Sequence, residues 1–318
     1  MAFAISLPFQ AVSDKMSFVA ALSSPCRDDR SRSGHLSAYK QPRPAVRLPA
    51  PPESLRLTSD RRHAHLPWLR CSEFLPRILD LGLAPEVAFK GPELDDLPGE
   101  RLATVARLVA QTGRRATVHA PFFDLSPGAM EPMVREVTLR RLTQSLQAAA
   151  RLGAHLMVVH PGYDRWRYPN LSAIWVDHAA ATFAPLVALA EQYDCRLALE
   201  NIYEESPATL VDLVERLDSP WFGHCFDIGH WRLFGRLPQE QWLAAIAGRL
   251  LHLHLHDNRG VNDDHLPVGE GHIDFSPLFI ALATMPAVPS LTLEAHDPEQ
   301  LQRSLVNLET LAAKEWSP

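Results

Sequence analysis

Residues 196–230 read RLALENIYEESPATLVDLVERLDSPWFGHCFDIGH. Two short apolar runs in this stretch, Arg196–Glu200 and Phe222–Asp227, each end in a carboxylate, and His230 follows three residues after the second. A helical stretch separates the two runs. This order of strand, helix and strand is typical of parallel strands joined by a crossover helix. It therefore predicts that the two carboxylates lie at the same edge of one sheet.

The same unit recurs along the chain on both sides of this stretch. Helical stretches with apolar or small residues at a spacing of three to four, such as Arg135–Leu152 and Ile174–Tyr193, separate the runs. Eight such units in about 255 residues match the usual size of a (β/α)8 TIM barrel, which is the α/β fold that we predict. The remaining predicted strands are His63–Leu66, Glu86–Phe89, Ala116–His119, Leu156–His160, Leu250–Leu255 and Ser290–Glu294.

The first 60 residues differ from the rest of the chain. The stretch from Arg27 to Arg62 is rich in Arg, Ser and Pro, and it lacks a sustained apolar period. Such a segment cannot repay the entropy of ordering, so we expect residues 1–60 to form a disordered extension and residues 61–318 to form the barrel. A faint resemblance to a signal peptide is interrupted by Asp14 and Lys15, so we expect no export.

Composition limits the classes of partner. The 318 residues carry a formal net charge of −6 and have a sequence pI near 6.2, which gives no overall attraction for nucleic acid. The four cysteines are scattered and form no CxxC pair, as in a reduced cytoplasmic protein. No apolar run approaches the ~20 residues that cross a bilayer, so we expect a cytoplasmic protein with no membrane contact.

Nine metal-type side chains end or closely follow the predicted strands. In a TIM barrel the carboxyl ends of the strands converge on one face, and that face carries the catalytic groups. We therefore expect the nine residues to surround one site. They are His119, His160, Glu200, Asp227, His230, His254, Asp263, His265 and Glu294.

Carboxylates and imidazoles bind divalent ions such as Zn, Mn, Fe and Co. Glu200 and Glu294 each close an apolar strand, where an unpaired carboxylate is costly and either a metal or a strong hydrogen-bond network is the natural compensation. Together with Asp227 and His254 they could hold one ion, and the other five residues could hold a second or third. For His252, His256 and His296 we retain the simpler interpretation of hydrogen-bonded polar residues or substrate contacts.

From about His63 onward the chain resembles the xylose-isomerase-like TIM-barrel superfamily, which includes sugar isomerases, ketose 3-epimerases and endonuclease IV. The motifs HAPF, HPG, LEN, FDIGH, HLHD, the DxH before LPVGEGHIDF, and LEAH occur in the family's order. Each motif is weak alone, but seven in order are specific to the superfamily. They do not select one activity.

Similarity to the epimerase branch implies that one divalent metal is held by Glu200, Asp227, His254 and Glu294. The two glutamates would act as acid and base in a metal-dependent isomerase or epimerase of a sugar, sugar phosphate or related polyol, through a metal-stabilised enediolate. His230 matches a histidine that contacts substrate. Arg259 lies near the family's substrate-binding arginine but is offset by one position.

Similarity to endonuclease IV implies an alternative, a phosphodiesterase with up to three metals and all nine residues as ligands. The loop FFDLSPGAMEP after His119 contains no Lys or Arg, which disfavours DNA because phosphate contacts dominate DNA affinity. The loop GYDRWRY carries Tyr163 and Trp166, which could stack on a base or a sugar, and His65 is a further candidate substrate contact. A non-catalytic barrel is a third class, and a homo-oligomer stays open.

Overall fold

The computed structural model describes residues 61–285 and 287–315. Eight parallel strands form a closed barrel in the order β1-β2-β3-β4-β5-β6-β7-β8, and β1 pairs with β8 to close it. The predicted (β/α)8 TIM barrel is therefore confirmed. The expected N-terminal extension, residues 1–60, lies outside the described residues.

The observed strands agree closely with the predicted ones, and three of them, β5, β6 and β7, have the predicted bounds. The fourth and eighth strands end one residue earlier than predicted, so His160 and Glu294 are the first residues beyond them. The strands are β1 Arg62–Pro67, β2 Ala84–Ala88, β3 Thr117–His119, β4 Leu156–Val159, β5 Arg196–Glu200, β6 Phe222–Asp227, β7 Leu250–Leu255 and β8 Ser290–Leu293.

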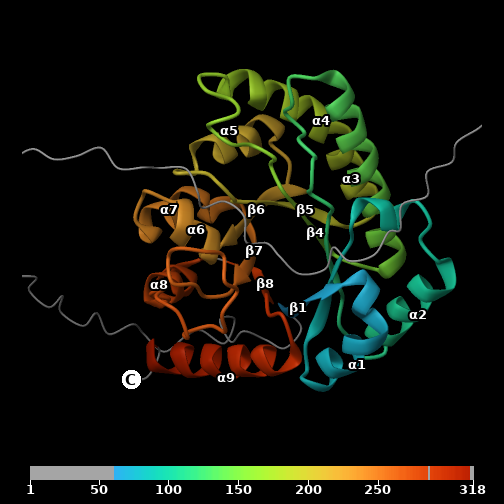
Figure 1. Cartoon of the computed structure of the whole chain (residues 1–318), viewed down its shortest axis with the longest axis vertical. Coiled ribbons are helices and arrows are strands. Elements are labelled where there is room, and N and C mark those ends of the chain that lie inside the picture. The colour runs from blue at the N-terminus through green and yellow to red at the C-terminus, as the bar shows by residue number, and fades with distance from the viewer. Residues whose placement is uncertain (1–60, 286, 316–318) are drawn as a thin grey trace, which may run out of the picture. The chain divides into compact units, whose positions relative to one another are not determined.

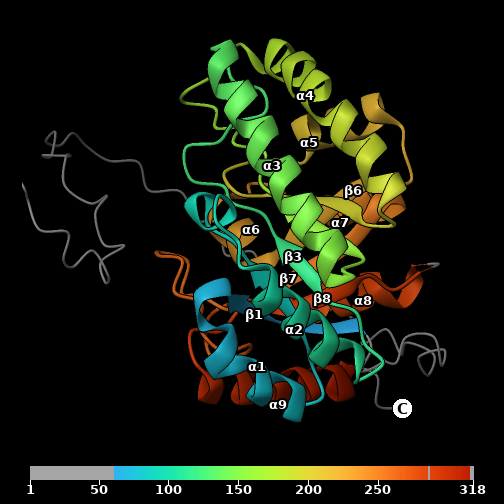
Figure 2. The ribbon, with the colours of Figure 1, turned by 90° about the vertical axis from the view of Figure 1, so that its right-hand side faces the viewer.

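Helices surround the barrel and cover its outer face (Figure 1). The last helix, α9, packs beside α1, so the ring of helices closes where the barrel closes (Figure 2). The helices are α1 Cys71–Asp80, α2 Gly99–Ala110, α3 Pro132–Leu152, α4 Ser172–Gln192, α5 Ala208–Leu217, α6 Ile228–Phe234, α7 Gln239–Ile246, α8 Ser276–Thr284 and α9 Pro298–Glu315. Short 3-10 turns are η3 Trp68–Arg70, η4 Gly91–Leu94 and η5 Ala247–Arg249.

The helix α4 is long and apolar enough to cross a membrane by length and composition, with a mean hydropathy of 1.4. This is an exception to the expectation that no such run exists. Burial accounts for part of this composition, because Trp175, Phe183 and Leu186 are fully buried and 39% of the apolar window is buried. On another face, Asp177 forms an ion pair with Arg216 of α5. The core helix of a soluble protein passes the same length and composition test.

The inside of the barrel is divided into an apolar and a polar half. Leu156, Val158, Ala198 and Cys225, from β4, β5 and β6, form a small buried apolar cluster of their own. Barrel interiors are usually filled by such branched and small side chains. On the opposite side, β1, β2, β7 and β8 contribute buried polar residues instead, namely His63, Glu86, His252, His254, Ser290 and Thr292.

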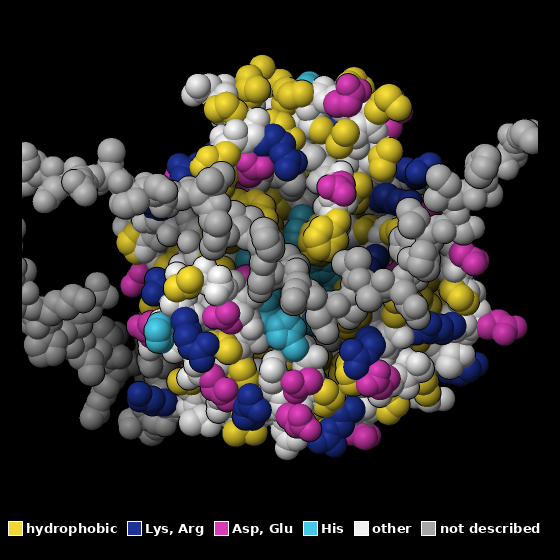
Figure 3. All heavy atoms as spheres, viewed as in Figure 1, with side chains coloured by type: hydrophobic (Ala, Val, Ile, Leu, Met, Phe, Trp, Pro, Cys, Tyr) yellow, Lys and Arg dark blue, Asp and Glu magenta, His cyan; other side chains and the backbone are white. Residues whose placement is uncertain are grey.

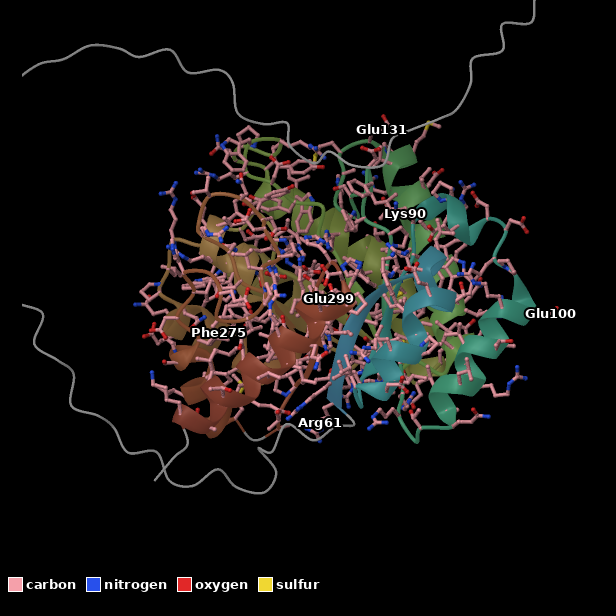
Figure 4. The ribbon with its side chains drawn as sticks, turned by 60° about the horizontal axis from the view of Figure 1, so that its bottom comes forward. Arg61, Lys90, Glu100, Glu131, Phe275 and Glu299 are labelled. Atoms are coloured by element: carbon pink, nitrogen blue, oxygen red, sulfur yellow. The ribbon has the colours of Figure 1, made fainter. Side chains whose placement is uncertain are left out.

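The two ends of the barrel are distinguished in Figure 4. Arg61 precedes β1 and lies at one end of the view, whereas Lys90 and Glu131 follow β2 and β3 and lie toward the other. Because all strands are parallel, the residues that follow them meet at the same end.

Candidate metal centre

All nine predicted residues meet in one connected group at the carboxyl ends of the strands, and we call them the strand-end cluster. Glu200 at the end of β5 lies at its centre. Its Oε2 atom is 3.3 Å from Nε2 of His119 and 3.2 Å from Nε2 of His160, and its Oε1 atom is 3.2 Å from Nδ1 of His230. Histidine side chains are visible near the centre of the face in Figure 3.

Four residues from β5 to β8 form the inner part of the cluster, and we call them the quartet. The Nδ1 atom of His254 lies 3.4 Å from Oε1 of Glu200, 3.3 Å from Oε1 of Glu294 and 3.8 Å from Oδ2 of Asp227. Glu200, Asp227 and His254 are almost completely buried, and Glu294 is 8% exposed. Three carboxylates therefore converge on a single ring nitrogen away from solvent.

A third group lies toward the loop between β7 and α8. The Oδ2 atom of Asp263 is 3.1 Å from Nε2 of His265 and 3.4 Å from Nε2 of His230. His265 also approaches Glu294, at 3.6 Å. The backbone of His265 has a φ of 47°, in the left-handed region that non-glycine residues seldom occupy. Such strained backbone tends to concentrate at functional sites.

Local structure explains why Asp227 and His230 stay together. Asp227 is the N-cap of α6, and its Oδ1 accepts a 2.6 Å hydrogen bond from the backbone N–H of His230. Asn201, which follows Glu200, exchanges two hydrogen bonds of 2.9 Å with the backbone of Asp227. Hydrogen bonds between the LEN and FDIGH motifs therefore hold the ends of β5 and β6 together.

Asp257, the second residue after β7, organises the loop that carries Asp263 and His265. Its buried carboxylate accepts hydrogen bonds from the backbone N–H groups of Gly269, Gly271 and Ile273, at 2.9–3.1 Å. A Cβ on Gly271 would lie 2.3 Å from Oδ1 of Asp257, so glycine is needed for this close approach. The motif LPVGEGHID thus wraps around one carboxylate.

Neighbouring groups of opposite charge shift the pKa values of the carboxylates and histidines of the cluster. Burial alone would raise the pKa of Glu200, but His254 and His160 outweigh it and hold that pKa well below its usual range. Burial lowers the pKa of His265, yet Asp263 and Glu294 raise it to about 9. Glu204 in the loop after β5 is different, because burial raises its pKa to about 7 and backbone N–H groups oppose the shift only weakly.

The quartet fits a divalent metal. The Nδ1 atom of His254 is buried and makes no hydrogen bond, although three carboxylates surround it. A buried polar atom without a partner is costly, and a cation bound between this nitrogen and the carboxylates would satisfy all of them. Other groups also have ligand atoms within 4.8 Å of one another, and they include His119–His160–Glu200, His256–Asp263–His265 and Glu86–His252–His254. The donor set is O/N, which suits Zn, Mn, Fe or Co.

Comparison with known proteins agrees with this geometry. The family model for the xylose isomerase-like TIM barrel matches residues 83–314. The chain belongs to this family. The match includes β3 to β8 and therefore every residue of the strand-end cluster.

Three relatives of this family member are informative. The protein MJ1311 of Methanocaldococcus jannaschii is 36% identical over 166 residues, which cover 50% of this chain but only 56% of that protein. The TTHB071 protein from Thermus thermophilus, solved after soaking with ZnCl2, is 32% identical with a TM-score of 0.70. A D-tagatose 3-epimerase-like protein is 25% identical, also with a TM-score of 0.70. Each structure aligns with 80% of this chain and 98% of its own.

The predicted substrate contacts lie at varied distances from the cluster of this xylose isomerase-like barrel. Nδ1 of His65 on β1 is 4.0 Å from Oε1 of Glu294 and therefore borders the quartet. Tyr163 packs against the ring of Trp175 of α4. Trp166 is 63% exposed, and Arg259 is exposed with only its carbonyl near His272. Of these four residues, His65 is the one whose contact with the quartet is given by a distance, and the substrate contacts of the other three stay predictions.

Two residues of the site were missed in the sequence. His256 was interpreted as a hydrogen-bonded polar residue or a substrate contact. Its Nε2 atom, however, lies 3.2 Å from both carboxylate oxygens of Asp227 and 3.7 Å from Glu294. His256 therefore belongs to the site, whereas His252 is a buried, hydrogen-bonded residue as expected. The second missed residue is Glu86 on β2. It is a carboxylate within the apolar run APEVAF, and a carboxylate in an apolar run is the same pattern that identified Glu200.

Proposed function

We propose that this protein is a divalent-metal-dependent isomerase or epimerase of a sugar, sugar phosphate or related polyol. The observation that carries the proposal is the position of Glu200 and Glu294, whose carboxylates flank the same ring nitrogen of His254. The family and the 25% identical D-tagatose 3-epimerase-like structure support this class of reaction. A small carbohydrate-like substrate is the partner that we expect.

The residues divide the work between binding and proton transfer. Glu200, Asp227, His254 and Glu294 would hold the ion, which as a Lewis acid would polarise adjacent carbonyl and hydroxyl oxygens of the substrate. One glutamate would take the proton from the carbon beside the carbonyl, and the other would deliver a proton to a carbon from its own side. Burial of both carboxylates limits access of bulk water to this transfer.

The test is a screen of ketoses, aldoses and their phosphates with the metal-loaded protein. We expect Glu200→Gln and Glu294→Gln each to lower kcat by about 10²- to 10⁴-fold, since general acid–base catalysis contributes that much. Glu270→Gln is a matched control, because this carboxylate follows the same end of the barrel but pairs with Arg303. Full turnover by the metal-loaded Glu200→Gln and Glu294→Gln proteins would refute the acid–base roles of these two glutamates.

A second candidate is a phosphodiesterase with several metals. The assembly of all nine residues into one cluster, with separate groups around Glu200 and Asp263, favours it. Clustered metals generate hydroxide and stabilise a leaving oxygen. Metal analysis combined with an abasic-site cleavage assay tests this candidate. A content of one ion per chain would exclude it, and failure to cut abasic duplex with two or three ions bound would exclude the DNA version.

A further inference from the structure

A buried carboxylate lies directly beneath the quartet. Glu86 of β2 is fully buried inside the barrel, and its Oε1 atom is 3.2 Å from Nε2 of His254. The other oxygen, Oε2, is held from three sides. Hydroxyl groups of Thr117 and Thr292 donate to it at 3.0 and 2.8 Å, and Nε2 of His252 lies 3.1 Å away.

The two ring nitrogens of His254 therefore face different partners. Nδ1 faces the three carboxylates of the quartet, and Nε2 faces Glu86. A neutral imidazole that gives one nitrogen to a metal carries its proton on the other. This Nε2 atom and Oε1 of Glu86 are both buried and make no hydrogen bond in the structure, although they lie only 3.2 Å apart. Each is thus the natural partner of the other.

We propose that Glu86 is a positioning residue that accepts the Nε2–H of His254 and so directs Nδ1 toward the metal. This inference rests on the proposed metal-dependent function and identifies a residue that acts through a ligand. A carboxylate behind a metal-bound histidine determines its tautomer and ring orientation. The three partners of Oε2, from β3, β7 and β8, prevent the Glu86 side chain from rotating away.

The fold of the barrel does not by itself require a carboxylate at this position. Parallel strands of a barrel bury branched apolar side chains, and the other half of this barrel does so with Leu156 and Val158. Burial of an ionised group is costly unless the group is paired and hydrogen-bonded. A role that requires a fixed negative charge below His254 accounts for its presence.

The affinity of the metal-free protein for Zn²⁺ is the first measurement, by competition with a chromogenic chelator. We expect Glu86→Gln to weaken zinc binding by about 10- to 100-fold, the range found when such partners of metal-binding histidines are removed. Thr117→Val removes only one hydrogen bond to Oε2, so we expect a smaller loss in the same direction. If Glu86→Gln does not fold, Thr117→Val and Thr292→Val together provide the test.

The second measurement is ¹⁵N NMR of the histidine rings in the zinc-loaded protein, with the His254 signals assigned from a His254→Gln variant. We expect the proton on Nε2 of His254 in the wild type, and a change in its shift and exchange rate in Glu86→Gln. A merely structural role would leave both unchanged. Folded Glu86→Gln with wild-type zinc affinity and an unchanged His254 ring would overturn the inference. Absence of zinc binding by the wild type would instead contradict the proposed function.

Discussion

The Nε2 atom of His160 lies 3.2 Å from the Nε2 atom of His119. Both nitrogens also lie within 3.3 Å of Oε2 of Glu200. Burial lowers the pKa of both rings, but hydrogen bonding and attraction to Glu200 outweigh it only at His119, whose pKa is raised. Two lone pairs cannot face each other at this distance, so the pair holds either one shared proton or a cation.

This relationship predicts that the pair binds an ion of its own. Zinc titration followed by elemental analysis should show one ion fewer in His160→Ala than in the wild type, with the quartet ion retained. His160 contacts Oε2 of Glu200, whereas Oε1 of the same carboxylate faces His254, so we expect the quartet ion to stay bound when His160 is removed. An equal zinc content in both proteins would contradict a separate ion at this pair.

We predict that a side chain at Gly229 in FDIGH lowers both the stability of the fold and the affinity for zinc. A Cβ on Gly229 would lie 2.0 Å from Cε1 of His256, so the His256 ring would have to leave Asp227. We expect Gly229→Ala to destabilise the fold by about 1–3 kcal/mol, as overpacking does, and to weaken zinc binding. Gly248→Ala is the control, because its Cβ would meet nothing within 4 Å. Comparison of thermal unfolding and zinc affinity of the two variants tests the prediction. A Gly229→Ala protein that matched its control in both would show that His256 is not held in this way.

Asp257→Asn should loosen the loop that presents Asp263 and His265. The amide offers donors where the carboxylate accepts from Gly271 and Ile273, and a buried unsatisfied group costs about 1–3 kcal/mol. Hydrogen exchange of the Gly271 and Ile273 amides should become faster, while the amides of β5 stay protected. Asp274→Asn serves as a control, because this exposed carboxylate accepts one hydrogen bond from the backbone of Ser276 and the amide oxygen can still accept it. Unchanged exchange would mean that other contacts hold the loop.

Stability should fall in acid because several histidines are buried in the neutral form. Burial lowers the pKa of His224 from 6.5 to about 4 in the folded protein. Protonation therefore favours the unfolded chain, so the cost is absent above pH 6.5, grows as pH falls toward 4 and is constant below. This shift corresponds to about 3 kcal/mol.

We expect His224→Phe to lose correspondingly less stability between pH 7 and 4 than the wild type, measured by denaturant unfolding at each pH. The difference between the two proteins isolates His224 from the other acid-sensitive groups. Parallel pH profiles would show that protonated His224 is tolerated in the folded state.

The positions of the strands and their chain order were readable from the sequence. Apolar runs such as Arg196–Glu200 are local patterns, and their alternation with helices implies parallel pairing. Closure of the barrel then brings the ends of all strands to one face, so the quartet could be named without coordinates. The unusual cost of a carboxylate in an apolar run identified Glu200 and Glu294.

Only the tertiary structure decided which groups face one another. Glu86 and His254 meet because β2 and β7 cross the same barrel interior, and no local pattern records that distance. The same applies to His256, whose ring reaches Asp227 over Gly229, and to the contact between the rings of Tyr163 and Trp175. Strand periodicity gives the face of a side chain, but the neighbours across that face come from segments far away in the chain, through register and closure.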